Sequence, residues 1–327
     1  MTLTKLIKYL LFALLILAKT TNLFGSPKDT TRVGIFVTSI YDLDYLNNSY
    51  SIEFWMWRVN NVRDIHDSQH MYIANAKETS ILYSSSDLKD QKFNVIPVAH
   101  SDTLFWTYNL IRATVKHEFD ISNFPFDNEN LELRLEEDIY NAQDLYLKVD
   151  GTQSGLSKFI KIQNWKIDSL NFMTVDAFYK TSFGNPRNDS PNSYCQAKFI
   201  IPIKRDSSSM FWKLLSGLFV AFIISLFSLK ININEADARF GTCVGGLFAA
   251  IANMYIVNSN LPMISKFTFL DELHIMTFFF ILILFVTSTT SLKFHRQGND
   301  KKSGLLDNIV FYGLLSIYFI AVIILLP

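Results

Sequence analysis

Residues 237–260 read DARFGTCVGGLFAAIANMYIVNSN and guide the interpretation of the whole chain. They contain an uncharged run, Phe240–Val257, that is long enough to cross the hydrocarbon core of a bilayer, which takes about 17–25 residues. Small, polar and aromatic side chains recur along it at steps of four and three, which places them on one face of a helix. They are Gly241, Gly245, Phe248, Ala252, Tyr255 and Ser259. The stretch therefore predicts a membrane helix with one face that is not uniformly apolar.

Two interpretations of this helix are open from its own residues. Gly241 and Gly245 form a small-xxx-small pattern, which lets membrane helices pack closely, and close packing is the commoner use of such a pattern. In the alternative, the face lines a pore. Glu235 and Asp237 lie just before the uncharged run. Cation channels select and gate with acidic rings at a pore mouth and bulky apolar rings inside it.

Composition and the N-terminus point to an exported chain. The 327 residues include 30 Lys and Arg and 30 Asp and Glu, so no overall charge favours nucleic acid as a partner. Lys5 and Lys8 precede a short apolar core, Leu10–Ala18, which is typical of a secretory signal peptide. We expect this peptide to occupy residues 1–25, with cleavage near 20–25; an uncleaved anchor is the alternative.

Residues 26–206 are predicted to form an exported all-β domain. Short strands are broken by turn residues, which is typical of an antiparallel, immunoglobulin-like sandwich. The predicted strands are Gly34–Ile40, Tyr50–Trp57, Phe105–Val115, Asn130–Leu135, Leu145–Val149, Asp168–Thr181 and Tyr194–Ile203. Asn185–Asn192 is rich in Asn and Pro and predicts a hairpin loop between the last two strands. The chain's two cysteines, Cys195 and Cys243, fall in different regions, so we expect no disulfide.

Residues 207–327 contain four apolar segments of membrane length. We predict a four-helix transmembrane domain with helices at 209–229, 238–258, 268–293 and 305–326. If the β domain is exported, these basic residues fall on the inner side of the membrane: Lys230, Arg239, Lys293, Arg296, Lys301 and Lys302. That asymmetry obeys the positive-inside rule. Arg205 ends the last predicted strand just before the first helix, and so tight a connection transmits force better than a flexible linker does.

A stretch between two predicted strands carries a family resemblance. Residues 117–131 read HEFDISNFPFDNENL, which resembles the signature loop of the pentameric ligand-gated ion channels, the Cys-loop receptor family, and especially of its bacterial members. Animal receptors close this loop with two cysteines, where this chain has His117 and Leu131; bacterial members share that departure. Arg205 before the first helix, Asp237-Ala238-Arg239 at the second and Asn258–Pro262 after it are similar to the family as well.

The resemblance implies a homopentamer in which the second helix of each subunit surrounds a central pore for monovalent cations. Asp237 would form the selectivity ring, with Glu235 adding to its field, and Arg239 would point away from the lumen. Phe248 and Tyr255 would form the hydrophobic barrier, which blocks ions by dewetting. The expected pore-lining residues are Asp237, Gly241, Gly245, Phe248, Ala252, Tyr255 and Ser259.

The resemblance also implies a zone where the β domain acts on the membrane helices. Asp127 or Asp44 is expected to form a partly buried ion pair with Arg205, either as a coupling latch or as a static structural pair. The expected coupling residues are Asp44, Phe124, Pro125, Phe126, Asp127, Arg205 and Pro262.

Family members bind small-molecule agonists between neighbouring subunits, in a box of aromatic residues. The candidates on one subunit are Glu136, Asp138, Tyr179, Phe183 and Tyr194, and those on its neighbour are Trp55 and Trp57. Aromatic faces near a carboxylate suit an amine. The alternative is that these aromatic residues are ordinary core residues of the β domain. Protons are the alternative stimulus, because clustered carboxylates at Glu136, Glu137 and Asp138 would shift one another's titration.

Other protein classes fit the sequence less well. We expect no enzyme activity and no cofactor or metal site, because His66 and His70 lie four apart without an obvious third ligand. A non-conducting binding protein on a membrane anchor needs only one apolar helix. A transporter usually shows inverted repeats and broken helices. The expected location is the plasma membrane, as a multi-pass protein of a bacterial inner membrane with its β domain in the periplasm.

Overall fold

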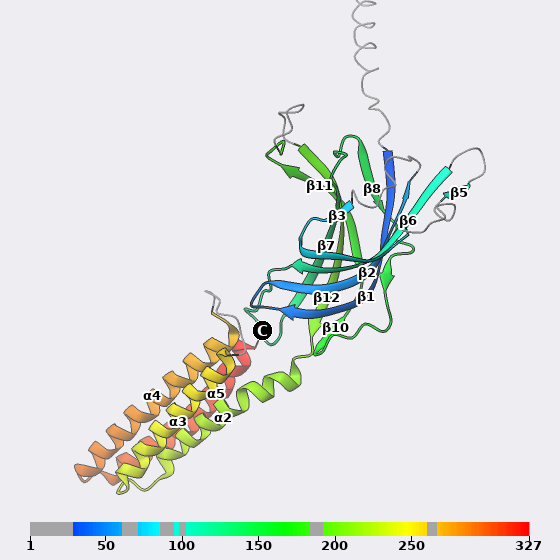
Figure 1. Ribbon diagram of the computed structural model, residues 1–327. Helices are drawn as coiled ribbons and strands as arrows, with labels where there is room; N and C mark the ends of the chain where they lie inside the picture. Colours follow the sequence, from blue (N-terminus) through cyan, green and yellow to red (C-terminus); the bar gives the residue numbers. More distant parts are fainter. Residues whose placement is uncertain are drawn as a thin grey trace, which may run out of the picture.

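The computed structural model describes residues 29–60, 71–85, 95–97, 103–183, 192–259 and 267–326. Figure 1 shows a β-rich domain joined to a bundle of helices. The strands are β1 (Asp29–Asp44), β2 (Ser49–Asn60), β3 (Met71–Ile73), β4 (Ala76–Ser84), β5 (Val95–Pro97), β6 (Thr103–Lys116), β7 (Asn128–Glu137), β8 (Leu145–Val149), β9 (Gly155–Leu156), β10 (Trp165–Ile167), β11 (Asn171–Tyr179) and β12 (Asn192–Arg205). The helices are α2 (Ser208–Phe227), a short η5 (Ser228–Lys230), α3 (Ala236–Asn258), α4 (Phe269–Arg296) and α5 (Asp300–Leu325). The predicted signal peptide lies outside the described residues.

The strands form two sheets. The larger sheet has the order β4-β6-β2-β1-β8, with β5 on β6 and β9 on β1; the smaller has the order β10-β12-β7-β3, with β11 on β12. The prediction of antiparallel pairing is wrong at one edge, because β1 pairs with β8 and β9 in parallel. The chain reaches β8 after crossing from the smaller sheet and enters beside the start of β1, where Asp29 N donates to Asp144 O at 3.0 Å.

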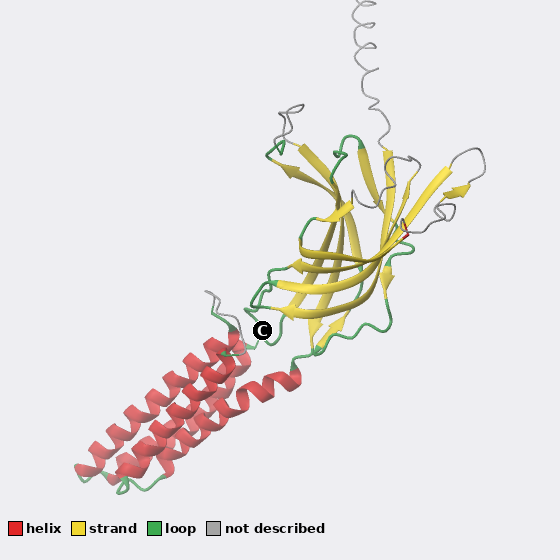
Figure 2. Cartoon of the chain, viewed as in Figure 1, coloured by secondary structure: helices red, strands yellow, loops and turns green. Residues whose placement is uncertain are grey.

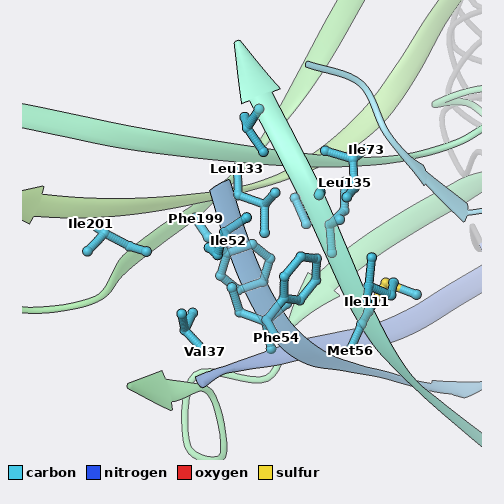
Figure 3. Close-up of a cluster of buried hydrophobic side chains, with 14 of the residues drawn as sticks. Val37, Ile52, Phe54, Met56, Ile73, Ile111, Leu133, Leu135, Phe199 and Ile201 are labelled. Atoms are coloured by element: carbon cyan, nitrogen blue, oxygen red, sulfur yellow. The ribbon is translucent and has the colours of Figure 1, made fainter. Parts of the chain in front are cut away.

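One buried core lies between the two sheets, and the alternation along β2 shows why. Ile52, Phe54 and Met56 are buried, whereas Trp55 and Trp57 point to the other face and are half-buried. Figure 3 shows side chains of both sheets meeting in this core. Fully burying one such side chain contributes about 1.5–3 kcal/mol. A two-layer β domain is therefore observed, and its immunoglobulin-like topology stays a prediction.

Four helices in the described part of the chain, α2 to α5, are long and apolar enough to cross a membrane. This agrees with the predicted four-helix membrane domain. α5 begins at Asp300, earlier than the predicted residue 305, and α4 continues to Arg296. The prediction followed apolar residues, whereas the backbone hydrogen bonds of a helix continue through polar turns.

Buried aromatic residues hold the bundle together. The rings of Phe222 on α2 and Tyr318 on α5 stack with their centroids 3.8 Å apart, and the Tyr318 hydroxyl lies 3.0 Å from Thr277 Oγ1 on α4. The connection to the β domain is short, as predicted, because β12 ends at Arg205 and α2 begins at Ser208. Figure 2 shows this strand-to-helix junction.

Candidate functional site

The predicted stripe of α3 is uncovered in a single chain. Asp237, Gly241, Gly245, Phe248, Ala252, Tyr255 and Ser259 are all exposed. Phe248 and Tyr255 expose 66% and 77% of their surface, which is unusual for aromatic residues that have packing partners. The opposite side of α3 packs inside the bundle through Arg239, Cys243, Gly246, Ala250 and Val257. The helix therefore turns the stripe away from the other helices of its own chain.

Close packing of α3 within the chain uses a glycine that was not predicted. A Cβ added to Gly241 or Gly245 would meet nothing within 4 Å. A Cβ added to Gly246 would lie 1.8 Å from Ser225 Oγ and 2.9 Å from the Ala221 carbonyl oxygen. Gly246 thus allows α2 and α3 to approach closely. The close-packing interpretation does not apply to Gly241 and Gly245 within this chain.

We predict that Gly246→Ala lowers the thermal stability of the detergent-solubilised protein, whereas Gly245→Ala does not. The Ser225 side chain can rotate away from the new methyl group, but the Ala221 carbonyl belongs to the α2 backbone and cannot. Overpacking of this kind costs about 1–3 kcal/mol. Size-exclusion chromatography after heating measures the difference. Equal losses in the two variants would instead place Gly245 against another copy of the chain.

The basic residue near the N-terminal end of α3 points away from the stripe, as expected. Arg239 is buried, and its Nη1 and Nη2 donate to the two carboxylate oxygens of Asp307 on α5 at 2.9 and 2.6 Å. Its Nε donates to Ser288 Oγ on α4 at 3.2 Å. Asp307 was not predicted as a site residue. The sequence does contain an indication of its importance: Asp307 is an ionisable residue within an apolar segment of membrane length, and such residues usually have a functional role.

At the junction of the two domains, Arg205 pairs with Asp127. Arg205 Nε and Nη2 donate to the Asp127 carboxylate oxygens at 2.6 and 2.8 Å, and both side chains are buried. Burial alone would lower the pKa of Arg205, but the hydrogen bond and charge of Asp127 outweigh it, so this pKa is raised. The alternative pairing with Asp44 is wrong. Asp44 is half-buried and instead accepts hydrogen bonds from Asn47 N and Nδ2 at 2.9 and 2.7 Å.

Aromatic rings enclose the Arg205 guanidinium. It lies 4.2 Å from the ring centroid of Trp165 and 4.9 Å from that of Phe124, and it donates to the Tyr45 hydroxyl. Such cation–π contacts contribute up to about 2 kcal/mol when they are desolvated. The guanidinium is therefore held from several sides at the membrane end of β12.

The loop between β6 and β7 contacts the N-terminal ends of α2 and α4. The Phe126 ring lies 5.6 Å from Phe211 on α2 and 5.9 Å from Phe269 on α4. Phe269 N donates to the Ser122 carbonyl at 2.8 Å. Phe124 belongs to the buried cluster of the helices, and Pro125 lies between it and Phe126. The predicted coupling residues of this loop thus contact the bundle; Pro262 lies outside the described residues.

A buried carboxylate underlies the first group of predicted ligand-binding aromatics. Glu136 is buried and accepts hydrogen bonds from the hydroxyls of Tyr72 and Tyr179 and from the Gln196 amide. Burial and the bond to Glu136 raise the pKa of both tyrosines, so their hydroxyls stay protonated and donate. Tyr72 and Gln196 were not predicted as site residues. For Tyr72 the reason is that it lies in a three-residue strand, which is too short to show a periodic pattern.

Two further aromatic rings, those of Phe183 and Tyr194, gather around Tyr179, which donates to this carboxylate. Phe183 lies 5.3 Å from Tyr179 and 6.3 Å from Tyr194 between ring centroids, and Tyr179 lies 5.9 Å from Tyr194. Phe183 is exposed, and the other two residues are half-buried. The structure therefore brings Tyr179, Phe183 and Tyr194 together over Glu136, as the prediction of a shared site requires.

The consecutive acidic residues Glu136, Glu137 and Asp138 do not all lie on one face of strand β7. Glu136 and Glu137 are consecutive in β7, so their side chains point to opposite faces of the sheet. Glu137 is buried in the interior, where Arg58 Nη1 donates to its carboxylate at 3.3 Å. Asp138 follows the end of the strand and is exposed.

The second aromatic group lies on the outward face of the larger sheet. A cavity of about 690 Å³ is lined by Phe36, Trp55, Trp57, Val59, Trp106, Tyr108, Asp150 and Gln153. Trp57 Nε1 donates to Asp150 Oδ2 at 3.4 Å, and the rings of Trp106 and Tyr108 stack 4.6 Å apart. Trp55 and Trp57 were predicted here. The two aromatic groups belong to different sheets.

The described residues contain no group of three or more His, Cys, Asp or Glu placed to hold a metal ion. Cys195 and Cys243 are both buried, and no disulfide joins them. His66 and His70 lie outside the described residues. No protein-family model matches the chain, and no curated protein matches it either.

Proposed function

We propose that the chain is a subunit of a ligand-gated cation channel in which identical subunits, five by resemblance to the Cys-loop receptor family, surround a pore lined by α3. The observation that carries this proposal is the face of α3 that its own chain leaves uncovered. That face combines an acidic residue at one end, Asp237, with the large rings of Phe248 and Tyr255. A charged residue on such a face is costly in contact with lipid, whereas it is solvated and can attract cations if the face lines a water-filled path.

The order of residues along α3 supports cation conduction. Glu235 and Asp237 are exposed at the end of the bundle far from the β domain, where their charge attracts cations and repels anions. Gly241 and Gly245 leave the adjacent part of the path wide. Phe248 and Tyr255 then narrow it with apolar surface, which blocks ions by dewetting when the channel is at rest.

An agonist would act at the β domain. We assign it to the interface between two subunits, where the rings over Glu136 on one copy face the Trp55 and Trp57 cavity on the next. Aromatic faces beside a carboxylate favour an amine or another organic cation. Movement there reaches α2 directly through β12, which ends at the Arg205–Asp127 pair. The loop containing Phe126 adds a second contact with the helices.

The charge pattern supports a multi-pass plasma-membrane protein with its β domain outside, in the periplasm if the membrane is a bacterial inner membrane. Lys293, Arg296, Lys301 and Lys302 lie where α4 meets α5, at the end of the bundle far from the β domain. Basic residues are enriched on the inner side of membranes.

Asp237→Ala tests the proposal. Oocytes expressing the chain are stepped in external pH and then given a panel of small amines while membrane current is recorded. We expect current that reverses near the cation equilibrium potential in the wild type. In the variant the reversal potential should collapse or move toward that of chloride, because the ring of charge is lost. Absence of current under all conditions, despite protein at the surface, would favour a non-conducting anchored receptor.

A further inference from the structure

α5 is the helix least expected to influence ion permeation, because much of its surface faces outward from the bundle. Leu305, Ile309 and Tyr312 are all exposed along it. Asp307 lies among them but points inward and exposes only 8% of its surface. A charged residue at this depth is costly unless it is paired. Its partner, Arg239, belongs to the helix that is proposed to line the pore.

Arg239 lies close enough to the inner mouth to oppose its charge. It is two residues from Asp237, which is about 3 Å along a helix axis. Charges within about 8–10 Å of each other are not fully screened at physiological salt. An uncompensated guanidinium at this level in every subunit would offset the field of the Asp237 ring.

The structure removes this opposition in two ways. The Arg239 side chain lies on the face of α3 that packs inside the bundle, so it is distant from the stripe. Its guanidinium is also neutralised by a two-point contact with Asp307, at 2.9 and 2.6 Å, and Ser288 Oγ accepts from Nε at 3.2 Å. Such bidentate pairs combine charge compensation with fixed geometry.

The inner end of α5 is fixed by further polar contacts, so the Asp307 carboxylate is held in place. Lys230 Nζ donates to Asn308 Oδ1 at 2.7 Å. The hydroxyls of Ser291 and Ser303 lie 2.7 Å apart. These contacts tie α5 to η5 and to α4 on both sides of the Arg239–Asp307 pair.

On the basis of the channel function proposed above, we propose that Asp307 determines ion selectivity as a positioning residue. It holds and neutralises Arg239 behind α3, so that Asp237 and Glu235 alone set the sign of the field at the inner mouth. Asp307 acts through Arg239 and does not itself contact the permeating ion.

The test is the permeability ratio of chloride to sodium, obtained from reversal potentials in a sodium chloride gradient. Asp307→Asn should raise this ratio several-fold, because the Arg239 charge is then uncompensated. The double variant Arg239→Gln with Asp307→Asn should return it to the wild-type value, and Asp307→Glu should stay close to wild type. Asp300→Asn is the matched control, because it removes an exposed carboxylate from the same helix.

A merely structural role predicts a different result. It would lower surface expression in the single variant without changing the permeability ratio, and such a result would overturn the proposal. If Asp307→Asn does not reach the surface alone, it is co-expressed with the wild type in increasing proportion, and the ratio should rise with its share. A ratio that stays constant in those mixtures would overturn the proposal as well.

The channel function fails separately from this inference. It fails if the wild type passes no current, or if Asp237→Ala leaves selectivity unchanged. The other outcome concerns Asp307 alone. If the wild type is cation-selective and Asp237→Ala changes its selectivity, but Asp307→Asn leaves the chloride-to-sodium permeability ratio unchanged, then the channel function stands and the proposed role of Asp307 fails.

Discussion

Phe248→Lys is expected to abolish cation current while the protein still reaches the surface. A unit charge about 5 Å away costs a passing cation roughly 1 kcal/mol even in water. A ring of such charges raises the barrier by several kcal/mol, and each 1.4 kcal/mol is about tenfold in rate. We therefore expect current to fall by about 100-fold or more. Folding should be preserved, because Phe248 exposes 66% of its surface in the single chain.

Phe248→Ala is the matched control for this variant. It removes the same ring without adding charge, so it should keep or increase the current, because a hydrophobic constriction has been widened. Normal current through surface-expressed Phe248→Lys would show that α3 does not line a conducting path. Ligand binding to the β domain should be unaffected in both variants.

The second large effect is expected at the junction of the domains, where Asp127→Asn should be far more damaging than Asp44→Asn. Asp127 is buried against Arg205, and breaking a buried pair from one side costs about 3–5 kcal/mol. Asp44 is half-buried and accepts hydrogen bonds from Asn47, and an ordinary hydrogen bond contributes only about 0.5–1.5 kcal/mol. Thermal unfolding and stimulus-evoked current of the two variants measure the contrast; equal and small effects would contradict it.

A double variant separates coupling from simple stability. Replacing both Asp127 and Arg205 with leucine removes the two charges together, which is often tolerated when the apolar residues pack well. If thermal stability recovers but evoked current does not, the pair acts as a coupling latch. If both recover, the pair is structural only.

The parts of this fold that were predictable are those with a long periodic signal. Strand β2 alternates over its whole length, so the shared face of Trp55 and Trp57 follows from the sequence. The membrane helices are equally clear, because an apolar run of their length has few other uses. β9 has two residues and β3 has three, too few for periodicity, so the partners that they supply, such as Tyr72, were missed.

Site residues could be predicted where their placement depends only on their own helix or loop. Ion pairs between segments that are distant in the sequence could not be predicted. The α3 stripe needed only helical spacing. The choice between Asp127 and Asp44 depended on which carboxylate is buried beside Arg205, and sequence does not encode distance between segments. Glu137 was misassigned for a related reason: its neighbours in sequence are acidic, but its neighbour in space is Arg58.

The division of the aromatic residues between two sheets has a thermodynamic consequence. If the rings over Glu136 and the Trp55 cavity form one binding site only when two copies meet, then an isolated chain has two incomplete halves and no full site. Any ligand of that site binds the assembled state in preference to the separated one. By mass action it then stabilises the assembly by RT ln(1 + [L]/Kd) for each occupied interface. The ligand would be part of what keeps the subunits together as well as the signal that they receive.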